Sequence, residues 1–379
     1  MARILMSKAT VGVEEEEALI RAIRSGWVTP LGPEVDAFEA EICERTGVAH
    51  ALALSSGTAA LHLALLELGA KPGACVVLSS MTFAATANAV AYTGADAVFV
   101  DSRESDGNVD SELMLEAVRT LQTEGREVVA AIPVDLFGRC VEYDVLEAGL
   151  TELGVPMLAD AAESLGATFK GKAAGAYGRA AAFSFNGNKI MTTSGGGMLV
   201  SDDAELINRA RYLSTQARQP APWYEHTEVG YNYRMSNILA AIGRAQVAKL
   251  DGFIARRREI RAMYMEAFAD IEGLRFLGSA EEVEGTSDNC WLTAIDLDTD
   301  LCANADDMVA HLDANDIEGR HLWKPMHMQP VWKDSRAFAN GVCEGLFQRG
   351  VTLPSGYGLS DGEIERVIEA VRAGLQRNS

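Results

Sequence analysis

Between residues 49 and 200, short apolar segments alternate with segments of helical spacing, and no other feature constrains the fold as strongly. Strands that are separated by helical segments form a mostly parallel sheet with helices on both faces. We therefore predict the α/β class. The expected strands are residues 49–54, 74–78, 97–100, 128–133, 156–159, 180–185 and 197–200, and the expected helices between them are 59–68 and 82–92.

The pattern changes after about Gly252. Two helices, at residues 13–25 and 34–45, precede the alternating region. We therefore predict a large domain over residues 1–250 and a smaller C-terminal α/β domain over residues 251–379. The expected elements of the second domain are a long charged helix at 253–269, a strand at 290–297, and helices at 305–315 and 361–375.

The chain is acidic, with 33 Lys and Arg residues against 54 Asp and Glu residues and a formal net charge of −21. A nucleic-acid backbone binds clustered Lys and Arg, so this charge argues against nucleic acid as the main partner. An anionic substrate would need a local pocket that is basic or rich in N–H groups. The six cysteines are scattered without a Cys/His cluster, which predicts reduced thiols, no metal site and a cytoplasmic location. We expect no membrane span, because the best candidate, residues 47–66, divides into strand, turn and helix.

A turn of small residues, Ser55-Ser56-Gly57-Thr58, stands between an expected strand and an expected helix. Backbone N–H groups at a helix N-terminus are a ready site for an anion. A simple capped turn has the same sequence. A phosphate site and a capping turn therefore both remain open on this motif alone.

Asp160 and Lys189 each follow an expected strand. Ligands bind at the carboxyl ends of strands in open α/β sheets, although Asp160 could instead cap the next helix. Lys189 precedes a Gly-rich turn at residues 192–197. A lysine in a partly dry site can form a Schiff base, because its amine becomes nucleophilic once deprotonated. The alternative is a solvated loop lysine.

A further polar segment, residues 230–236, offers the Asn232 amide and the Arg234 guanidinium, with a capping loop as the alternative. The order of phosphate turn, strand-end Asp and loop Lys points to a site for pyridoxal phosphate. That cofactor needs an anion cradle, a carboxylate that keeps the pyridinium nitrogen protonated, and a lysine for the Schiff base.

Together these motifs resemble those of the DegT/DnrJ/EryC1/StrS sugar aminotransferases, a group within the fold-type I (aspartate aminotransferase-like) enzymes. The resemblance runs from about Glu15 to the C-terminus and implies a pyridoxal phosphate-dependent enzyme of that fold. It is carried by residues 25–29, 31–33, 56–58, 81–83, 160–162, 184–189 and 232–234.

The resemblance implies a role for each matching residue. Lys189 would bind the cofactor covalently and shuttle protons, and Asp160 would pair with the pyridinium nitrogen. Phe83 would stack on the pyridine ring. Asn232 would reach the phosphate in the neighbouring subunit, which makes the protein a homodimer with shared sites. Glu163 stands where many members have Gln or His in contact with the ring hydroxyl, so its protonation state is open. The phosphate is expected to contact Ser56, Gly57, Thr58 and Ser184.

Two stretches, residues 186–197 and 322–330, are similar to enzymes that aminate UDP-4-keto-6-deoxy-N-acetylglucosamine on the bacillosamine route of glycan biosynthesis. L-glutamate is the expected donor and 2-oxoglutarate its product. GDP-perosamine synthases, which act on GDP-4-keto-6-deoxymannose, are the alternative. Trp323 offers a stacking face and His327 a hydrogen-bond donor, although both fit a packed loop equally well. Lys324 and Arg234 are the candidate cations for the diphosphate.

Two rival functions remain, a cofactor-dependent sugar dehydratase and a sensory or scaffolding protein that keeps the fold. Some relatives of the group carry His in place of the lysine and act as dehydratases, so Lys189 argues against that branch. No GxGxxG follows the first strand, which argues against a Rossmann dehydrogenase. We interpret Trp27, Trp223 and Trp291 as packing residues.

Overall fold

The computed structural model describes residues 2–278, 283–302 and 304–376. Its main feature is a mostly parallel sheet in the order β1-β9-β8-β5-β4-β2-β3-β13. Parallel bridges from Ala131 to Met157 and from Val134 to Asp160 join its two halves. Strand β9 is antiparallel to both of its neighbours, and the other pairs are parallel. The strands are β1 (His50–Leu54), β2 (Cys75–Ser79), β3 (Asp96–Val100), β4 (Val128–Ile132), β5 (Leu158–Asp160), β8 (Ala180–Ser184), β9 (Gly197–Ser201) and β13 (Ala337–Phe338).

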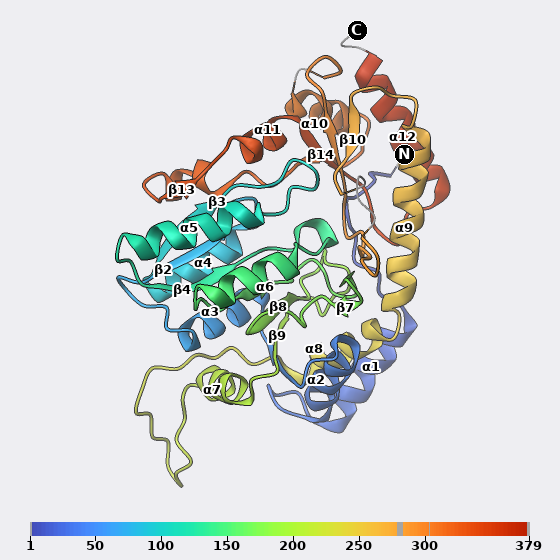
Figure 1. The fold of residues 1–379 in the computed structure, drawn as a ribbon. Coiled ribbons are helices and arrows are strands. Elements are labelled where there is room, and N and C mark those ends of the chain that lie inside the picture. The colour runs from blue at the N-terminus through green and yellow to red at the C-terminus, as the bar shows by residue number, and fades with distance from the viewer. Residues whose placement is uncertain (1, 279–282, 303, 377–379) are drawn as a thin grey trace.

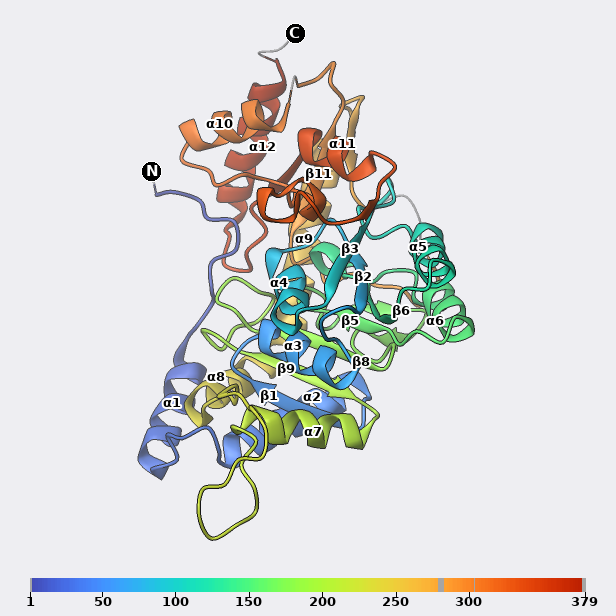
Figure 2. The same ribbon diagram turned by 90° about the vertical axis from the view of Figure 1, so that its left-hand side faces the viewer.

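Helices cover both faces of this sheet, as the alternation predicts. Figure 2 shows α3 and α4 on one side and α5 and α6 on the other. Successive side chains of a strand point to opposite faces, so Val76 and Leu78 pack in one apolar cluster while Cys75 and Val77 pack in the other. The helices of the first side are α3 (Gly57–Glu67), α4 (Ala84–Thr93) and α7 (Ala204–Ser214); those of the second are α2 (Pro33–Thr46), α5 (Ser111–Thr123) and α6 (Tyr143–Glu152). Helices α1 (Val13–Ser25) and α8 (Asn237–Val247) pack together, and α8 also packs on α2.

A second, antiparallel sheet has the order β10-β11-β14-β12. Its apolar cluster includes Tyr264, Ile295, Leu312 and Val351. Figure 1 shows the long helix α9 running from the region of α1 and α8 up to this sheet. The elements are α9 (Leu250–Ala267), β10 (Leu274–Phe276), β11 (Thr293–Leu297), α10 (Ala305–Ala314), β12 (Arg320–His321), α11 (Val342–Arg349), β14 (Gly350–Leu353) and α12 (Asp361–Gln376); a small hairpin of β6 (Thr168–Phe169) and β7 (Lys172–Ala173) lies elsewhere.

Two segments cross the predicted boundary at residue 250. Near the N-terminus, Ile4 is buried in the apolar cluster of the second sheet, and its N–H donates to Asp316 O at 2.8 Å. From the C-terminal part, β13 pairs with β3 in the main sheet. The division into residues 1–250 and 251–379 therefore stays a prediction.

Several observed elements were not expected, and two differences concern the sheets described above. Helices α5 and α6 were not among the expected elements, although both cover the main sheet. The strand expected at residues 290–297 begins only at Thr293, because Cys290 has a φ of +54°, which a strand does not allow.

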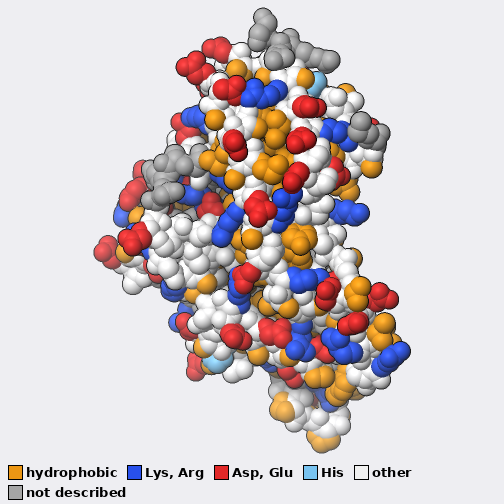
Figure 3. Space-filling model, turned by 90° about the vertical axis from the view of Figure 1, so that its right-hand side faces the viewer, with side chains coloured by type: hydrophobic (Ala, Val, Ile, Leu, Met, Phe, Trp, Pro, Cys, Tyr) orange, Lys and Arg blue, Asp and Glu red, His pale blue; other side chains and the backbone are white. Residues whose placement is uncertain are grey.

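On the face drawn in Figure 3, the charged side chains are spread rather than gathered. Figure 3 shows acidic and basic side chains interspersed over one face, without a continuous patch of either sign. Arg244, for example, contacts Glu34 at 2.7 Å and Glu41 at 2.8 Å. None of the described helices is both long enough and apolar enough to cross a bilayer.

Asp101 fixes the C-terminal part of the chain to the main sheet. It follows β3, is buried, and accepts hydrogen bonds from the N–H groups of Asn340 and Gly341 at 2.9 Å and of Cys343 at 2.7 Å. One carboxylate thus satisfies the first N–H groups of α11 and of the loop before it.

We expect Asp101→Ala to lower the free energy of unfolding by about 3 kcal/mol, because several N–H donors would lose their acceptor. The measurement is urea unfolding followed by far-UV circular dichroism. Glu124→Ala is the control, since its exposed ion pair with Arg336 links the same regions and should contribute less than about 1 kcal/mol. Equal losses in the two variants would contradict the role given to Asp101.

Candidate active site

A cavity of about 320 Å³ lies at the carboxyl ends of β5 and β8, beside the N-terminus of α3. This edge of an open α/β sheet is where ligands bind. The cavity joins the turn before α3, the start of α4 and the loop after β8. Eight of the predicted site residues line it: Ser56, Gly57, Thr58, Phe83, Asp160, Glu163, Ser184 and Lys189.

The turn before α3 forms a cradle of N–H groups. Ser56 caps the helix, with its Oγ accepting from Ala59 N at 3.0 Å. A Cβ on Gly57 would lie 3.1 Å from Ser184 Cβ, and a Cβ on Gly197 would lie 2.4 Å from Gly57 N. The strand ends therefore approach the turn too closely for larger residues. Since helix N-termini bind phosphate through free N–H groups, this cradle fits the phosphate of the expected cofactor.

Asp160 lies buried on the far side of the cavity, as the last residue of β5. Its Oδ2 accepts from the Thr86 hydroxyl at 2.6 Å, and its Oδ1 accepts from Ala162 N at 3.1 Å. Burial raises the pKa of Asp160, while these hydrogen bonds and the charge of Lys189 act to lower it. A buried carboxylate of this kind fits a protonated ring nitrogen, which would supply a close positive charge.

Lys189 and Glu163 form an ion pair inside the cavity. Lys189 Nζ lies 3.3 Å from Glu163 Oε1, and the two side chains are only 10% and 4% exposed. Glu163 Oε2 also accepts from Phe137 N at 2.7 Å. Burial raises the pKa of Glu163, and the charge of Lys189 and the Phe137 hydrogen bond oppose that shift. The pair places an amine and a proton acceptor within reach of a ligand in the cavity.

Aromatic side chains border the ion pair. Lys189 Nζ lies 4.0 Å from the ring centroid of Trp291, which is 1% exposed. Trp323 packs against Phe83, with ring centroids 5.7 Å apart, and against Phe137 at 5.8 Å. The Phe83 side chain is 57% exposed at the cavity wall, so its ring is free to stack on a ligand.

The structure does not bring the other predicted residues into this cavity. Asn232 and Arg234 line a separate cavity of about 580 Å³. The Arg234 side chain is 4% exposed and its Nη2 lies 3.3 Å from Glu39 Oε1. His327 Nδ1 contacts Ser80 Oγ at 2.6 Å, and Lys324 is half-buried nearby. The roles of Asn232, Arg234, Trp323, Lys324 and His327 therefore stay predictions.

Three contributions to the site escaped the sequence interpretation. Thr86 holds Asp160 from α4, one turn after Phe83. Asn289 Nδ2 donates to Glu163 O at 2.8 Å. Trp291 is a packing residue as expected, but it also contacts the Lys189 amine. The spacing of Thr86 from Phe83 on a helix could have indicated that the two side chains face the same site, whereas nothing local marks Asn289 or Trp291.

No group of His, Cys, Asp and Glu side chains within the described ranges is arranged to hold a metal ion.

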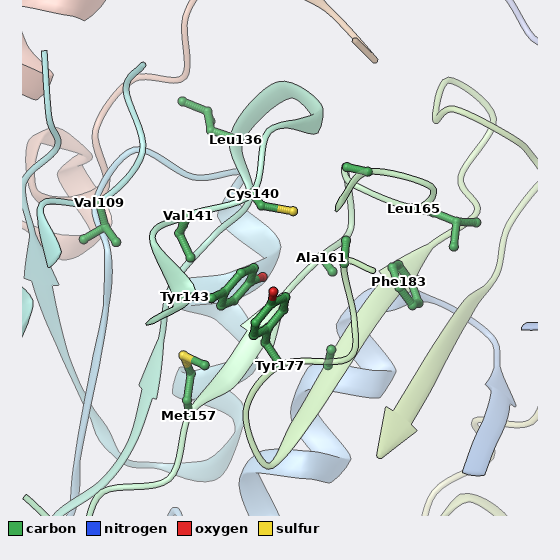
Figure 4. Close-up of a cluster of buried hydrophobic side chains, with 14 of the residues drawn as sticks. Val109, Leu136, Cys140, Val141, Tyr143, Met157, Ala161, Leu165, Tyr177 and Phe183 are labelled. Carbon is green, nitrogen blue, oxygen red and sulfur yellow. The ribbon is translucent and has the colours of Figure 1, made fainter. Parts of the chain in front are cut away.

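A different buried acid, Asp135, lies under the site. It accepts from Ser164 Oγ at 2.6 Å, Tyr143 Oη at 2.8 Å and Val141 N at 2.9 Å. Figure 4 shows Tyr143 beside Tyr177 in a cluster of buried apolar side chains. Burial raises the pKa of Asp135 to about 7, against the effect of these hydrogen bonds.

Residues 10–372 match the sequence model of the DegT/DnrJ/EryC1/StrS aminotransferase family. The chain is 44% identical over 373 residues to the Bacillus subtilis (strain 168) protein named "Putative pyridoxal phosphate-dependent aminotransferase EpsN", covering 97% of this chain and 95% of that protein. It is 34% identical to the GDP-perosamine synthase of Caulobacter vibrioides (strain ATCC 19089 / CIP 103742 / CB 15) over 369 residues, or 97% of each chain. A solved DegT DnrJ EryC1 StrS aminotransferase from Brucella abortus is similar with a TM-score of 0.87 and 30% identity, over 96% of this chain and 95% of that chain.

Asp135 should give stability a measurable pH dependence. Between its usual value of 3.8 and about 7, the unfolded carboxyl is ionised while the folded one keeps its proton. The unfolded state then binds fewer protons, so stability falls as pH rises through this window. The difference in unfolding free energy between the native protein and Asp135→Asn should therefore fall by up to about 1.4 kcal/mol per pH unit.

Urea unfolding at half-unit steps from pH 4.5 to 8 measures this difference. Asp144→Asn is the matched control, because the hydrogen bond and charge of Lys170 lower the pKa of that exposed carboxyl. Its difference from the native protein should stay flat above pH 5. A flat curve for Asp135→Asn as well would show that Asp135 does not take up its proton on folding.

Proposed function

The chain belongs to the DegT/DnrJ/EryC1/StrS aminotransferase family and is a pyridoxal phosphate-dependent aminotransferase, and we propose that it aminates a nucleotide-linked 4-keto-6-deoxyhexose. The amino group would come from L-glutamate and go to C4 of the sugar. We propose UDP-4-keto-6-deoxy-N-acetylglucosamine as the substrate. The single observation that carries the proposal is the buried ion pair of Lys189 and Glu163 in one cavity with Asp160 and an N–H cradle.

The residues of this cavity would hold the cofactor at both ends. The N–H groups after Ser56 and the Ser184 hydroxyl would bind its phosphate, and Asp160 would pair with its ring nitrogen. Phe83 would stack on the ring. When bound, pyridoxal phosphate supplies an electron sink for the carbon that loses or gains a proton.

Lys189 would then move that proton. In the donor half-reaction its Nζ would take a proton from the α-carbon of the donor and pass it to the cofactor, and in the sugar half-reaction it would pass a proton from the cofactor to C4 of the sugar. Glu163 Oε1, 3.3 Å away, would stabilise the ammonium form while Lys189 holds the proton within each half-reaction. The low exposure of both side chains limits the access of bulk water to this pair.

Two neighbouring regions support a nucleotide-sugar substrate. Trp323 packs against Phe83, which lines the cavity wall. A sugar could therefore lie between these two aromatic rings and the Lys189 amine. Lys324 is the better candidate for the diphosphate than Arg234, which is engaged by Glu39. The similarity to GDP-perosamine synthases keeps GDP-4-keto-6-deoxymannose as the alternative substrate.

A homodimer would complete the site. Asn232 lies outside the cavity of its own chain, so it would reach the phosphate only in a partner. Large apolar side chains are exposed along the same region: Trp27, Val28, Leu31, Tyr224 and Val229. We propose that this surface pairs two copies of the chain, in a cytoplasmic enzyme of glycan biosynthesis.

Lys189→Ala should abolish the first half-reaction. Without any sugar, the native protein loaded with cofactor should release about one equivalent of 2-oxoglutarate from L-glutamate, because the donor half-reaction is complete in itself. The variant should release it at least about a hundredfold more slowly. Lys71→Ala, an exposed lysine paired with Glu127, is the control and should behave as the native protein. An undiminished release in Lys189→Ala would remove Lys189 from the chemistry.

The substrate is tested with the two 4-ketosugars in parallel. We expect amination of UDP-4-keto-6-deoxy-N-acetylglucosamine, followed by mass spectrometry of the aminosugar, and at least about tenfold lower kcat/KM for GDP-4-keto-6-deoxymannose. The reverse preference would make the protein a perosamine synthase. Conversion of neither sugar, with 2-oxoglutarate still released, would reject both substrates and leave the aminotransferase.

A further inference from the structure

The closest aromatic contact of the Lys189 amine comes from outside the main sheet. Lys189 follows β8, whereas Trp291 lies just before β11 of the second sheet. The ammonium lies 4.0 Å from the centroid of the indole ring, which is within the range of a cation–π interaction. Trp291 is almost wholly buried, so water does not compete for this contact.

Hydrogen bonds fix the indole to the loop that carries the lysine. Trp291 Nε1 donates to the carbonyl oxygen of Asn188, the residue before Lys189, at 2.7 Å. The hydroxyl of Ser7 donates to the same carbonyl at 2.8 Å. Any movement of the indole relative to the lysine would therefore break a bond to the neighbouring backbone.

The backbone of Trp291 is held equally firmly. Its N–H donates to Asn289 Oδ1 at 2.8 Å, and its carbonyl oxygen accepts from the buried guanidinium of Arg257 at 2.6 Å. Arg257 also donates to Ser7 Oγ at 3.0 Å, which closes the network around the lysine loop. Between Asn289 and Trp291, Cys290 adopts a φ of +54°, a strained conformation for a residue with a side chain.

We propose that Trp291 is a positioning residue that holds the Lys189 amine on its indole face whenever that amine is free and protonated. The inference rests on the proposed role of Lys189 in proton transfer. A lysine side chain has four rotatable bonds, so a free amine would otherwise sample many positions. The indole face and Glu163 Oε1 together leave it one position, at the cavity wall. The lysine is then in place to give its proton back.

The contact is tested first on protein freed of cofactor, where no substrate is needed. Lys189 is labelled at pH 7.5 with trinitrobenzenesulfonate, which reacts with the unprotonated amine, and the labelled peptide is quantified by mass spectrometry. We expect labelling to be about three- to tenfold faster in Trp291→Leu, because the ammonium loses its π face. Trp291→Phe keeps an aromatic face and should rise by less than half as much.

Matched variants separate this role from packing. Trp332→Leu removes a tryptophan that packs on Phe99 and does not contact the lysine, so its labelling rate should stay near the native one. Trp291→Met, whose unbranched side chain adapts better to an irregular gap, replaces the Leu variant if that protein does not purify. Equal rates in Trp291→Leu and Trp291→Phe, or an equal rise in Trp332→Leu, would overturn the proposal.

The half-reaction with glutamate gives a second readout. Since the indole positions the amine and does not bind the donor, Trp291→Leu should lower the rate at saturating glutamate by about three- to tenfold and leave the half-saturating concentration within about twofold. A change confined to the half-saturating concentration would contradict the inference. If Lys189→Ala loses activity while labelling is unaffected by Trp291, only the inference about Trp291 fails. If Lys189→Ala stays active, the proposed role of Lys189 fails with it.

Discussion

Three carboxyl groups, those of Asp135, Asp160 and Glu163, are buried together at the end of β5, and the rest of the site depends on how they are neutralised. Burial raises the pKa of Asp135 and of Glu163, and the charge of Asp160 adds a smaller contribution to both shifts. The charge of Lys189 opposes the shifts at Asp160 and Glu163. Hydrogen bonds from hydroxyl and N–H groups also stabilise the three carboxylates. The bond from Phe137 N to Glu163 is one of them. The loops that supply these donors are therefore fixed by electrostatics as much as by apolar packing.

The second sheet takes part in the site through one buried network. Arg257 on α9 binds the carbonyl of Trp291, and it also binds Ser7 from the N-terminal segment and the carbonyl of Ser355. Burial lowers the pKa of Arg257 to about 10, so it keeps its charge at neutral pH. A charge held by carbonyl and hydroxyl oxygens inside the protein is costly to move. It therefore ties the lysine loop rigidly to both parts of the molecule.

Local sequence was sufficient for the parts of the site that lie on one strand and its loop. Asp160 and Lys189 each follow an apolar strand, and the topology of a parallel sheet brings such strand ends together. Trp291 could not be predicted, because its place depends on a left-handed residue, Cys290, and on contacts between distant segments. Strand β13 could not be predicted either, because a strand of two residues carries no periodicity in the sequence. The role predicted for Asn232 stays a prediction, because in this chain Asn232 lines a separate cavity.

The acidic chain can bind anionic ligands because its two cavities are lined by different kinds of group. Lys189 is the one Lys or Arg among the described residues that line the first cavity, so a phosphate there would be held by N–H and hydroxyl groups of the turn before α3. Such dipoles bind an anion without adding net charge to the site. The separate cavity, in contrast, is lined by Arg218 and Arg234. If two copies of the chain pair across the exposed apolar surface, this second cavity would bring Arg218 to the partner's substrate, whereas Arg234 stays paired with Glu39. Neutral donors would then hold the cofactor, and charged ones would hold the diphosphate that has to enter and leave.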